Sequence, residues 1–361
     1  MNQFQEKIAA WLSRTGPDRS VTQCFDLPIV LATDIGLQRS ENQDRVAALR
    51  IGLRTGGARP LIAVVVVDGM GGMRDGGKCA TLALSSFFYA LTLYRTHNLQ
   101  RRASAAIAYA NDEVFKFAEG KGGATLSAVL LDEDLHPFIV NIGDSRIYAF
   151  GAGSKVERLT RDDSLAEAVG GHGRDLLQFV GMGGGMQPHV RSVPVSLKNL
   201  AVTTDGIHFI ESGTLEAVLS HVSELKSAAE RLAALARWCG APDNASSAMV
   251  DLQSLAEKIR SGGDSGIQLW DSFGSLAAIW IRDEISGGDR TPSASYSEKP
   301  TTSQPVDSLP PRDPKAERSK GKSSSKKAKK AKKPSPQKED VQLEIQIEQS
   351  SSSDDADENS R

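Results

Sequence analysis

The pattern of apolar and polar positions along this chain has two periods, which separate predicted strands from predicted helices. The run LIAVVVV at 61–67 is continuously apolar and rich in β-branched side chains, which is typical of a strand buried on both faces. The run ends abruptly at Asp68 and a glycine-rich loop. Apolar residues then recur at helical spacing over 77–94, and a second helix is predicted over 103–118.

Beyond residue 120 the pattern changes to short apolar runs separated by turn-forming residues. It predicts four strands that form one antiparallel meander, at 125–131, 138–142, 146–150 and 156–159. Further strands are predicted at 200–203, 245–252 and 276–281, and a helical stretch at 213–238. Because most of these strands follow tight turns, we expect antiparallel sheets and an α+β fold.

The last part of the chain lacks the residues needed for a core. Residues 286–361 carry 15 Lys or Arg and 13 Asp or Glu, and their large apolar side chains are almost confined to a short stretch near Val341. Such a composition favours disorder. We therefore divide the chain into a helical N-terminal extension over 1–26, a globular domain over 27–285, and a disordered tail over 286–361 that is Lys-rich first and acidic at its end.

The N-terminus and the cysteines bear on the cellular compartment. MNQFQEKIAAWLSRTG has polar residues where a signal peptide needs an apolar run, so it predicts a short amphipathic helix. No stretch approaches 18 uninterrupted apolar residues, so no transmembrane helix is expected. Cys24, Cys79 and Cys239 are odd in number and far apart, which favours reduced thiols and a cytoplasmic location.

Four aspartates stand where predicted strands begin or end, namely Asp44, Asp68, Asp205 and Asp243. Strand ends hold side chains rigidly, and carboxylates that converge there need cations to stay ionised. A ligand set of oxygens alone suits Mg²⁺ or Mn²⁺ better than zinc. An Asp-Gly pair taken alone is more often only a turn. The interpretation therefore depends on the four aspartates together.

Six short segments in a fixed order give the chain a family resemblance. They are GLQRSENQD at 36–44, DGMGG at 68–72, GATLSA at 123–128, NIGDSRIY at 141–148, TDG at 204–206 and DN at 243–244. Together they resemble the metal-dependent (type 2C) protein serine/threonine phosphatases over 34–252. Met70 resembles bacterial members, because eukaryotic members usually carry histidine at that position.

The resemblance implies both a fold and an activity. The fold is a four-layer α-β-β-α sandwich, in which helix pairs flank two packed antiparallel sheets, and the catalytic domain covers 27–285. The implied activity is hydrolysis of phosphoserine and phosphothreonine in proteins, with a dinuclear Mg²⁺ or Mn²⁺ centre and a metal-activated water.

The resemblance also implies roles for particular residues. The metal ligands map onto Asp44, Asp68, Gly69, Asp205 and Asp243. Asp68 is expected to bridge both ions, and Gly69 contributes its carbonyl. Arg39 matches the arginine that holds the substrate phosphate, for which a planar guanidinium is suited. Asp68, Asp205, Asp243 and Arg39 form the expected catalytic set.

The sequence departs from the family pattern at three positions. Gln43 stands where many members have Glu. Met70 replaces the histidine that is proposed to protonate the leaving group. Gly120, beside Glu119, stands where many members carry a carboxylate that supports a third ion. We therefore expect two ions and leave a third open.

Three other signals have competing interpretations. The GMGGG segment at 181–185 lacks the lysine of a nucleotide-binding loop. The family resemblance implies that the region before it is a mobile flap beside the active site, and glycine-rich mobility there would suit a substrate-gating loop. Asp144 in GDSR could belong to a nucleophile cluster, but we interpret it as part of a structural turn. His208 could be an acid or a ligand, but we interpret it as a hydrogen-bonded, partly buried histidine.

The expected partners are phosphorylated proteins, including targets of a Ser/Thr kinase, and the chain is expected to be a monomer. The segment 312–338 has 12 Lys or Arg against two acids and either contacts anionic partners or is a solvated tail. Two alternatives remain. One is a catalytically dead relative that binds phosphoproteins, although dead relatives usually lose metal ligands. The other is a nucleic-acid-tethered protein dominated by its tail.

Overall fold

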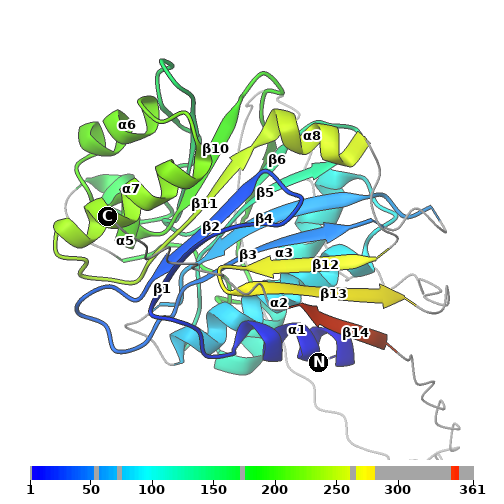
Figure 1. The fold of residues 1–361 in the computed structure, drawn as a ribbon. Coiled ribbons are helices and arrows are strands. Elements are labelled where there is room, and N and C mark those ends of the chain that lie inside the picture. The colour runs from blue at the N-terminus through cyan, green and yellow to red at the C-terminus, as the bar shows by residue number, and fades with distance from the viewer. Residues whose placement is uncertain are drawn as a thin grey trace, which may run out of the picture. The chain divides into compact units, whose positions relative to one another are not determined.

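The computed structural model describes residues 2–52, 57–70, 75–170, 175–260, 266–280 and 343–348, with the side chains of 278–280 and 343–348 left aside. The chain divides into two units, one formed by 1–283 with 343–361 and the other by 284–342. All described residues belong to the first unit (Figure 1).

Two antiparallel sheets form the centre of this unit (Figure 1). The first sheet has the strand order β1 (Arg19–Gln23), β2 (Ile29–Asp34), β11 (Ala245–Asp251), β10 (Asn199–Thr203), β7 (Arg146–Phe150) and β8 (Glu157–Arg158). The second has the order β14 (Leu343–Glu348), β13 (Gly274–Trp280), β12 (Ile267–Asp271), β3 (Arg45–Ile51), β4 (Leu61–Val67), β5 (Leu126–Asp132), β6 (Phe138–Ile142) and β9 (His189–Ser192).

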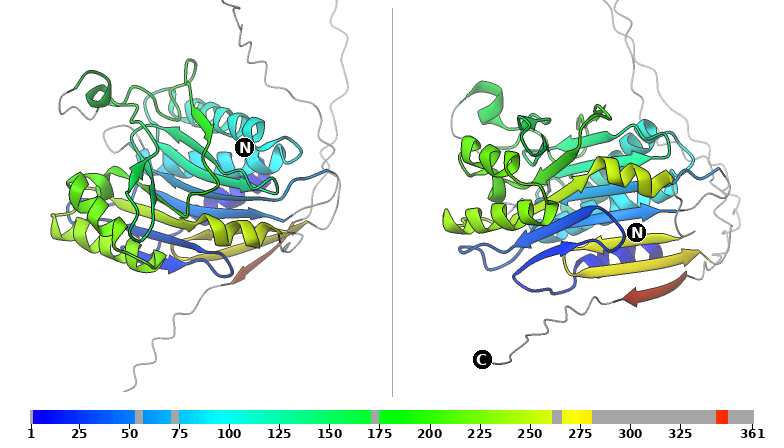
Figure 2. Two further views of the ribbon diagram at one scale, coloured as in Figure 1. Left: turned by 90° about the horizontal axis from the view of Figure 1, so that it is seen from above. Right: turned by 45° about the horizontal axis from the view of Figure 1, so that its top comes forward.

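Helices cover the outer face of each sheet, on opposite sides of the unit (Figure 2). The second sheet packs against α1 (Gln3–Leu12), α2 (Gly76–Leu93) and α3 (Leu99–Ala118). The first sheet packs against α5 (Asp205–His208), α6 (Ser212–Ser220) and α7 (Leu225–Trp238). Two helices complete the set, α4 (Leu165–Val169) and α8 (Leu252–Arg260). Among the described residues, no helix combines the length and apolarity that crossing a membrane requires.

Strand β4 shows why the run at 61–67 is continuously apolar. Ala63 and Val65 belong to the core between the second sheet and its helices. Val64 and Val66 face the other way, into the core between the two sheets. Because both faces of the strand are buried, neither can carry polar side chains. The predicted four-layer sandwich of two antiparallel sheets and flanking helices is confirmed.

The predicted bounds of single strands and helices agree with the structure in several places. The strands β4, β6 and β7 have the predicted bounds, and α2 differs from its prediction by one residue at each end. The prediction of one four-stranded meander was wrong. The loop between β6 and β7 carries the chain from the second sheet to the first, where β7 pairs with β10. The predicted helix over 213–238 is two helices, α6 and α7.

The two ends of the chain contribute more strands than the sequence predicted. Strand β1 pairs with β2, so the predicted N-terminal extension contains a strand of the first sheet as well as α1. From the tail that we predicted to be disordered, the structure describes only 343–348, which form β14 at the edge beside β13. In that register Ile347 lies opposite Leu276, a buried core position.

We expect removal of residues 286–361 to preserve the fold, because it takes away one edge strand and none of the two-sheet core. The melting temperature should fall by roughly 2 °C, which corresponds to about 1 kcal/mol in a domain of this size. Far-UV circular dichroism and a thermal melt of a protein truncated after Ile285 would measure this. Loss of a cooperative transition would contradict it.

Candidate functional site

Strand register places Asp44 and Asp68 side by side. In the antiparallel pair β3–β4, Arg45 lies opposite Val67. Asp44 directly precedes β3 and Asp68 directly follows β4, so both carboxylates lie at the same end of this pair. The sequence pattern predicted these two residues at strand ends, and their pairing comes from the register.

The first sheet supplies three more carboxylates in the same way. Thr203 of β10 lies opposite Arg146 of β7, so Asp205 beyond β10 and Asp144 before β7 lie at a shared end. Asp243 precedes β11, whose first residue pairs with the last residue of β2. The Asp68 carboxylate interacts electrostatically with those of Asp44, Asp144, Asp205 and Asp243. We refer to these five residues as the carboxylate cluster.

Burial and mutual repulsion oppose ionisation in the carboxylate cluster. Burial raises the pKa of Asp68 well above its ordinary value, and the four neighbouring carboxylates raise it further. Burial, and then Asp205 and Asp243, raise the pKa of Asp44 to about 7. Burial, with Asp205 and Asp162, raises the pKa of Asp144 to about 7. The cluster therefore requires nearby positive charge to be fully ionised at neutral pH.

Arg39 supplies part of this positive charge. Its Nη2 donates to Asp243 Oδ2 at 2.6 Å. This hydrogen bond raises the pKa of Arg39, and the charges of Asp205 and Asp68 also raise it. The Arg39 side chain is 40% exposed. It therefore remains accessible to a ligand while it neutralises one edge of the cluster.

One carboxylate oxygen of Asp44 offers a place for further positive charge. The residue is 3% exposed. Its Oδ2 accepts a hydrogen bond from Thr204 Oγ1 at 3.0 Å, whereas its buried Oδ1 has no hydrogen-bond partner among the described residues. A buried carboxylate oxygen without a partner is costly, and a cation would satisfy it.

The backbone after Asp68 is fixed and closely packed. Asp68 N–H donates to Thr125 Oγ1 at 3.0 Å, and Asp68 O accepts from Thr125 N–H at 2.9 Å. A Cβ at Gly69 would lie 2.4 Å from the carbonyl oxygen of Gly76, so only glycine fits at this position. The backbone directly after Asp68 is therefore in close contact with that of Gly76.

The donor set fits hard divalent cations, because it consists of carboxylate and carbonyl oxygens. As the side chains stand, no group of three or more His, Cys, Asp or Glu residues in the described ranges is arranged to hold a metal ion.

The structure brings together the residues that the sequence singled out, namely Arg39, Asp44, Asp68, Gly69, Asp205 and Asp243. It adds Asp144, which we had interpreted as part of a turn. The signal in the sequence was its position beside a predicted strand. Glu119, considered for a third ion, is outside the cluster: its side chain is 79% exposed and lies 3.9 Å from Lys121.

His208, which the sequence left as an acid, a ligand or a hydrogen-bonded histidine, has a structural partner. His208 is buried and its Nδ1 lies 3.0 Å from Thr203 Oγ1. Burial, and then Arg146 and Arg158, lower its pKa well below the ordinary value, so its imidazole is neutral at pH 7. This matches the interpretation of a hydrogen-bonded histidine.

The glycines at 181 and 183 are anchored to α3. Asn111 Oδ1 accepts from Gly181 N–H at 2.9 Å and from Gly183 N–H at 3.3 Å. Gly183 has a φ of +81°, and a Cβ there would lie 2.7 Å from the ring of Phe115. Close packing therefore explains Gly181 and Gly183, whereas a Cβ at Gly184 or Gly185 would meet open space. The mobility of this segment stays a prediction. Residues 171–174 of the predicted flap lie outside the described residues.

Comparison with known proteins assigns the family. The family model described as "Protein phosphatase 2C" matches residues 38–252, which include the whole carboxylate cluster. This chain belongs to the protein phosphatase 2C family. As a member, it is a phosphoprotein hydrolase. The search of curated proteins gives no match.

Solved bacterial phosphatases share the fold. The Ser-Thr phosphatase MsPP from Mycobacterium smegmatis, in complex with cacodylate, is 25% identical, with a TM-score of 0.51 over 64% of this chain and 99% of that one. The catalytic domain of PstP, in complex with two manganese ions, is 24% identical, with a TM-score of 0.51 over 62% and 96%. Stp1 from Staphylococcus aureus is 18% identical, with a TM-score of 0.54 over 66% and 99%.

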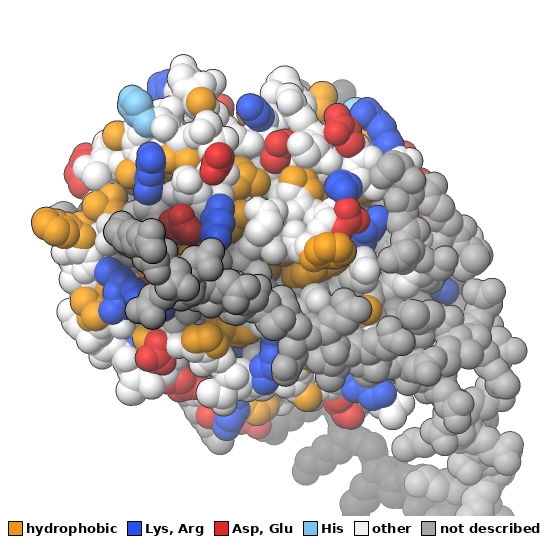
Figure 3. All heavy atoms as spheres, in the orientation of Figure 1, with side chains coloured by type: hydrophobic (Ala, Val, Ile, Leu, Met, Phe, Trp, Pro, Cys, Tyr) orange, Lys and Arg blue, Asp and Glu red, His pale blue; other side chains and the backbone are white. Residues whose placement is uncertain are grey.

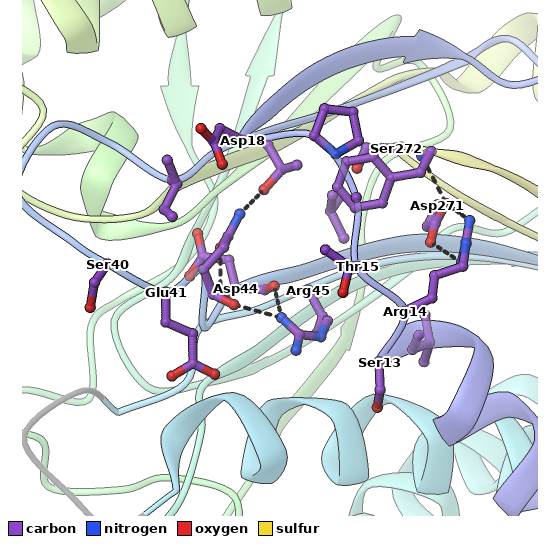
Figure 4. Close-up of a pocket in the computed structure, with 18 residues that line it drawn as sticks. Ser13, Arg14, Thr15, Asp18, Ser40, Glu41, Asp44, Arg45, Asp271 and Ser272 are labelled. Atoms are coloured by element: carbon purple, nitrogen blue, oxygen red, sulfur yellow. Dashed lines mark hydrogen bonds and ion pairs between the residues drawn. The ribbon is translucent and has the colours of Figure 1, made fainter.

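A cavity of about 300 Å³ lies beside the loop that carries Arg39 in this phosphatase. Ser40, Glu41 and Asp18 line one side of the cavity, and the ion pair between Arg14 and Asp271 lies on the other (Figure 4). Arg14 donates to both Asp271 oxygens, at 2.7 and 2.8 Å. The segment after α1 therefore forms a wall of a cavity next to the candidate site.

We expect the metal-free phosphatase to lose stability through Asp144 as the pH rises from 5 to 8. The folded-state pKa of Asp144 is about 7, above the unfolded-state value near 3.9, so the folded protein retains a proton that the unfolded chain has released. Raising the pH through this window therefore favours unfolding. Asp144→Asn should remove this dependence and become the more stable protein by about 2–4 kcal/mol at pH 8.

Urea unfolding of both proteins in EDTA at pH 5 and pH 8 measures the difference in the free energy of unfolding. Asp251→Asn is the control, because Asp251 lies at the other end of β11 and accepts hydrogen bonds from Gln253 and Ser254. An equal difference between Asp144→Asn and wild type at both pH values would contradict the expectation.

Proposed function

We propose that this chain hydrolyses phosphoserine and phosphothreonine in proteins with two divalent ions, Mn²⁺ or Mg²⁺, held by the carboxylate cluster. The observation that carries the proposal is the convergence of five carboxylates from both sheets beside one arginine. The PstP catalytic domain, which is similar to this chain, was crystallised with two manganese ions. This supports a two-ion centre.

We propose that Asp44, Asp68, the carbonyl of Gly69, Asp205 and Asp243 would hold the two ions, and that Asp68 would be the ligand they share. When bound, two such ions act as Lewis acids that lower the pKa of a water and neutralise charge on the phosphate. The unpartnered Oδ1 of Asp44 and the raised pKa of Asp68 support these assignments. Asp144 is also in the cluster, and the charge of Asp205 helps to raise its pKa.

Arg39 is proposed to bind the substrate phosphate. Its guanidinium is partly exposed and now pairs with Asp243 through Nη2. A phosphate group offers two oxygens to a planar guanidinium, which suits bidentate binding. Arg39 would therefore exchange one carboxylate partner for the phosphate of the substrate. Met70 cannot donate a proton, so the leaving alkoxide takes its proton from water or from another group.

The substrates, location and oligomeric state of the enzyme are also proposed. The substrates would be targets of a Ser/Thr kinase, and the enzyme would act as a cytoplasmic monomer with reduced cysteines. Over the face shown in Figure 3, described Lys and Arg side chains are interspersed with Asp and Glu. The segment 312–338, with 12 Lys or Arg against two acids, is proposed to contact an anionic partner.

We expect Asp68→Asn to lower kcat on a phosphothreonine peptide by at least about 10³-fold, or roughly 4 kcal/mol of barrier. The substitution removes the charge of the residue that is electrostatically coupled to all four other carboxylates. A release assay for phosphate across a Mn²⁺ titration, with EDTA as the metal-free reference, measures this. Asp251→Asn should retain wild-type turnover.

Two outcomes would contradict the proposal. One is wild-type protein that releases no phosphate at any Mn²⁺ concentration, which would favour the phosphoprotein-binding alternative. The other is turnover by Asp68→Asn equal to that of wild type in the same titration. Retained binding of the phosphopeptide by inactive wild-type protein would identify the binding alternative directly.

A further inference from the structure

Asn244 connects the loop of Arg39 to the strand that follows Asp243. Its side-chain Oδ1 accepts a hydrogen bond from Gln43 N–H at 2.8 Å. Its Nδ2 donates to Ile35 O at 2.8 Å and to Glu41 O at 3.0 Å. The residue is 4% exposed. One buried amide therefore joins three backbone groups spread along the loop.

These contacts use both donors and the acceptor of the Asn244 amide. No other residue type of this size offers two donors and one acceptor in the same plane. Aspartate would put a carboxylate oxygen in place of the donating Nδ2, and this oxygen would repel the carbonyl oxygens of Ile35 and Glu41. Alanine would leave the carbonyls of Ile35 and Glu41 and the amide of Gln43 without this partner, at a cost for each buried group.

The rest of the loop is tied mainly to β2. Gly36 N–H donates to Asp34 Oδ1 at 2.8 Å, and Asn42 Nδ2 donates to Thr33 Oγ1 at 2.8 Å. Leu37 N–H donates to Ala241 O at 2.9 Å. Residues 38–40 lie between these anchors, and Arg39 is among them. The Arg39 side chain is thus presented by a short segment whose ends are fixed.

Asn244 also orients the partner of Arg39. Its backbone N–H donates to Asp243 Oδ1 at 2.9 Å, while Asp243 Oδ2 accepts from Arg39 at 2.6 Å. The Asn244 backbone therefore sets the orientation of the Asp243 carboxylate, and its side chain holds the loop of Arg39. A single residue fixes the relative position of a phosphate-binding group and a proposed metal ligand.

We propose that Asn244 is a positioning residue, which holds Arg39 in place for the substrate phosphate. The proposal rests on the proposed function of Arg39. Since Asn244 acts through Arg39, its loss should weaken substrate binding more than it slows the chemical step. Its effect should also largely disappear when Arg39 is absent.

The test is a double-mutant cycle with Asn244→Ala and Arg39→Ala, in which kcat and KM are measured on a phosphothreonine peptide at saturating Mn²⁺. Asn244→Ala should raise KM by about 10-fold and change kcat by less than about threefold. In the Arg39→Ala background it should raise KM by less than about twofold. Asn199→Ala is the control, a buried asparagine at the end of β10 away from Thr203.

Hydrogen exchange provides a readout that does not depend on activity. The amide of Gln43 should exchange at least about 10-fold faster in Asn244→Ala, and at the wild-type rate in Asn199→Ala. Asn244→Asp keeps the size of the side chain and an acceptor for Gln43 N–H but loses both donors. It serves the KM measurements if Asn244→Ala does not fold.

The outcomes separate the proposal from the function on which it rests. Wild-type protein without Mn²⁺-dependent turnover would refute the proposed function and this role with it. An active wild type would refute the role alone in either of two cases. One is an unchanged KM in the Asn244 variants. The other is a double variant whose KM increase equals the product of the increases in the two single variants.

Discussion

The repulsion among five carboxylates at matched strand ends is the constraint on which this site depends. Antiparallel register brings Asp44 beside Asp68 in one sheet, and Asp205 beside Asp144 in the other. Burial and proximity then raise the pKa values of Asp44 and Asp144 to about 7. A fold that places acids in this way needs cations, and a sandwich with both sheet faces covered gives them a rigid place to bind.

The surroundings of the cluster meet this constraint with a few fixed groups. Arg39 lies against Asp243 at one edge, and the hydroxyl of Thr204 donates to Asp44. Gly69 allows the backbone after Asp68 to pack against that of Gly76. Asn244 joins the loop of Arg39 to the first sheet. Positive charge, hydrogen bonding and close backbone packing thus surround the acids.

Much of the fold could be predicted from the sequence, because single strands and helices leave local patterns. The apolar run of β4 and the short strands β6 and β7 were predicted with the bounds that the structure gives. What local pattern cannot show is the sheet that a strand joins. The connection at Gly143 is tight enough for a hairpin, yet it leads to the other sheet, so the meander prediction failed.

For the site as well, local sequence identified some residues, and only the pairing of distant segments brought in the others. Four aspartates were recognisable because each stands beside a predicted strand and within a family segment, and Arg39 because of its place in GLQRSENQD. Asp144 was missed because a turn explains Gly-Asp-Ser equally well in sequence, and only the pairing of β7 with β10 brings it near Asp205. The role of Asn244 was equally hidden, since its three side-chain partners are backbone groups 201–209 residues away in sequence.

The central claim is that divalent cations complete a carboxylate cluster that otherwise retains protons. Calorimetric titration of wild-type protein with Mn²⁺ at pH 6.5, in two buffers of different ionisation enthalpy, tests it directly. If cations replace the protons on Asp44 and Asp144, these two groups should release about 1.5 protons at pH 6.5, and their release should fall toward zero as the pH rises to about 8.5. A binding enthalpy that is independent of the buffer at pH 6.5, or no binding at all, would contradict this account.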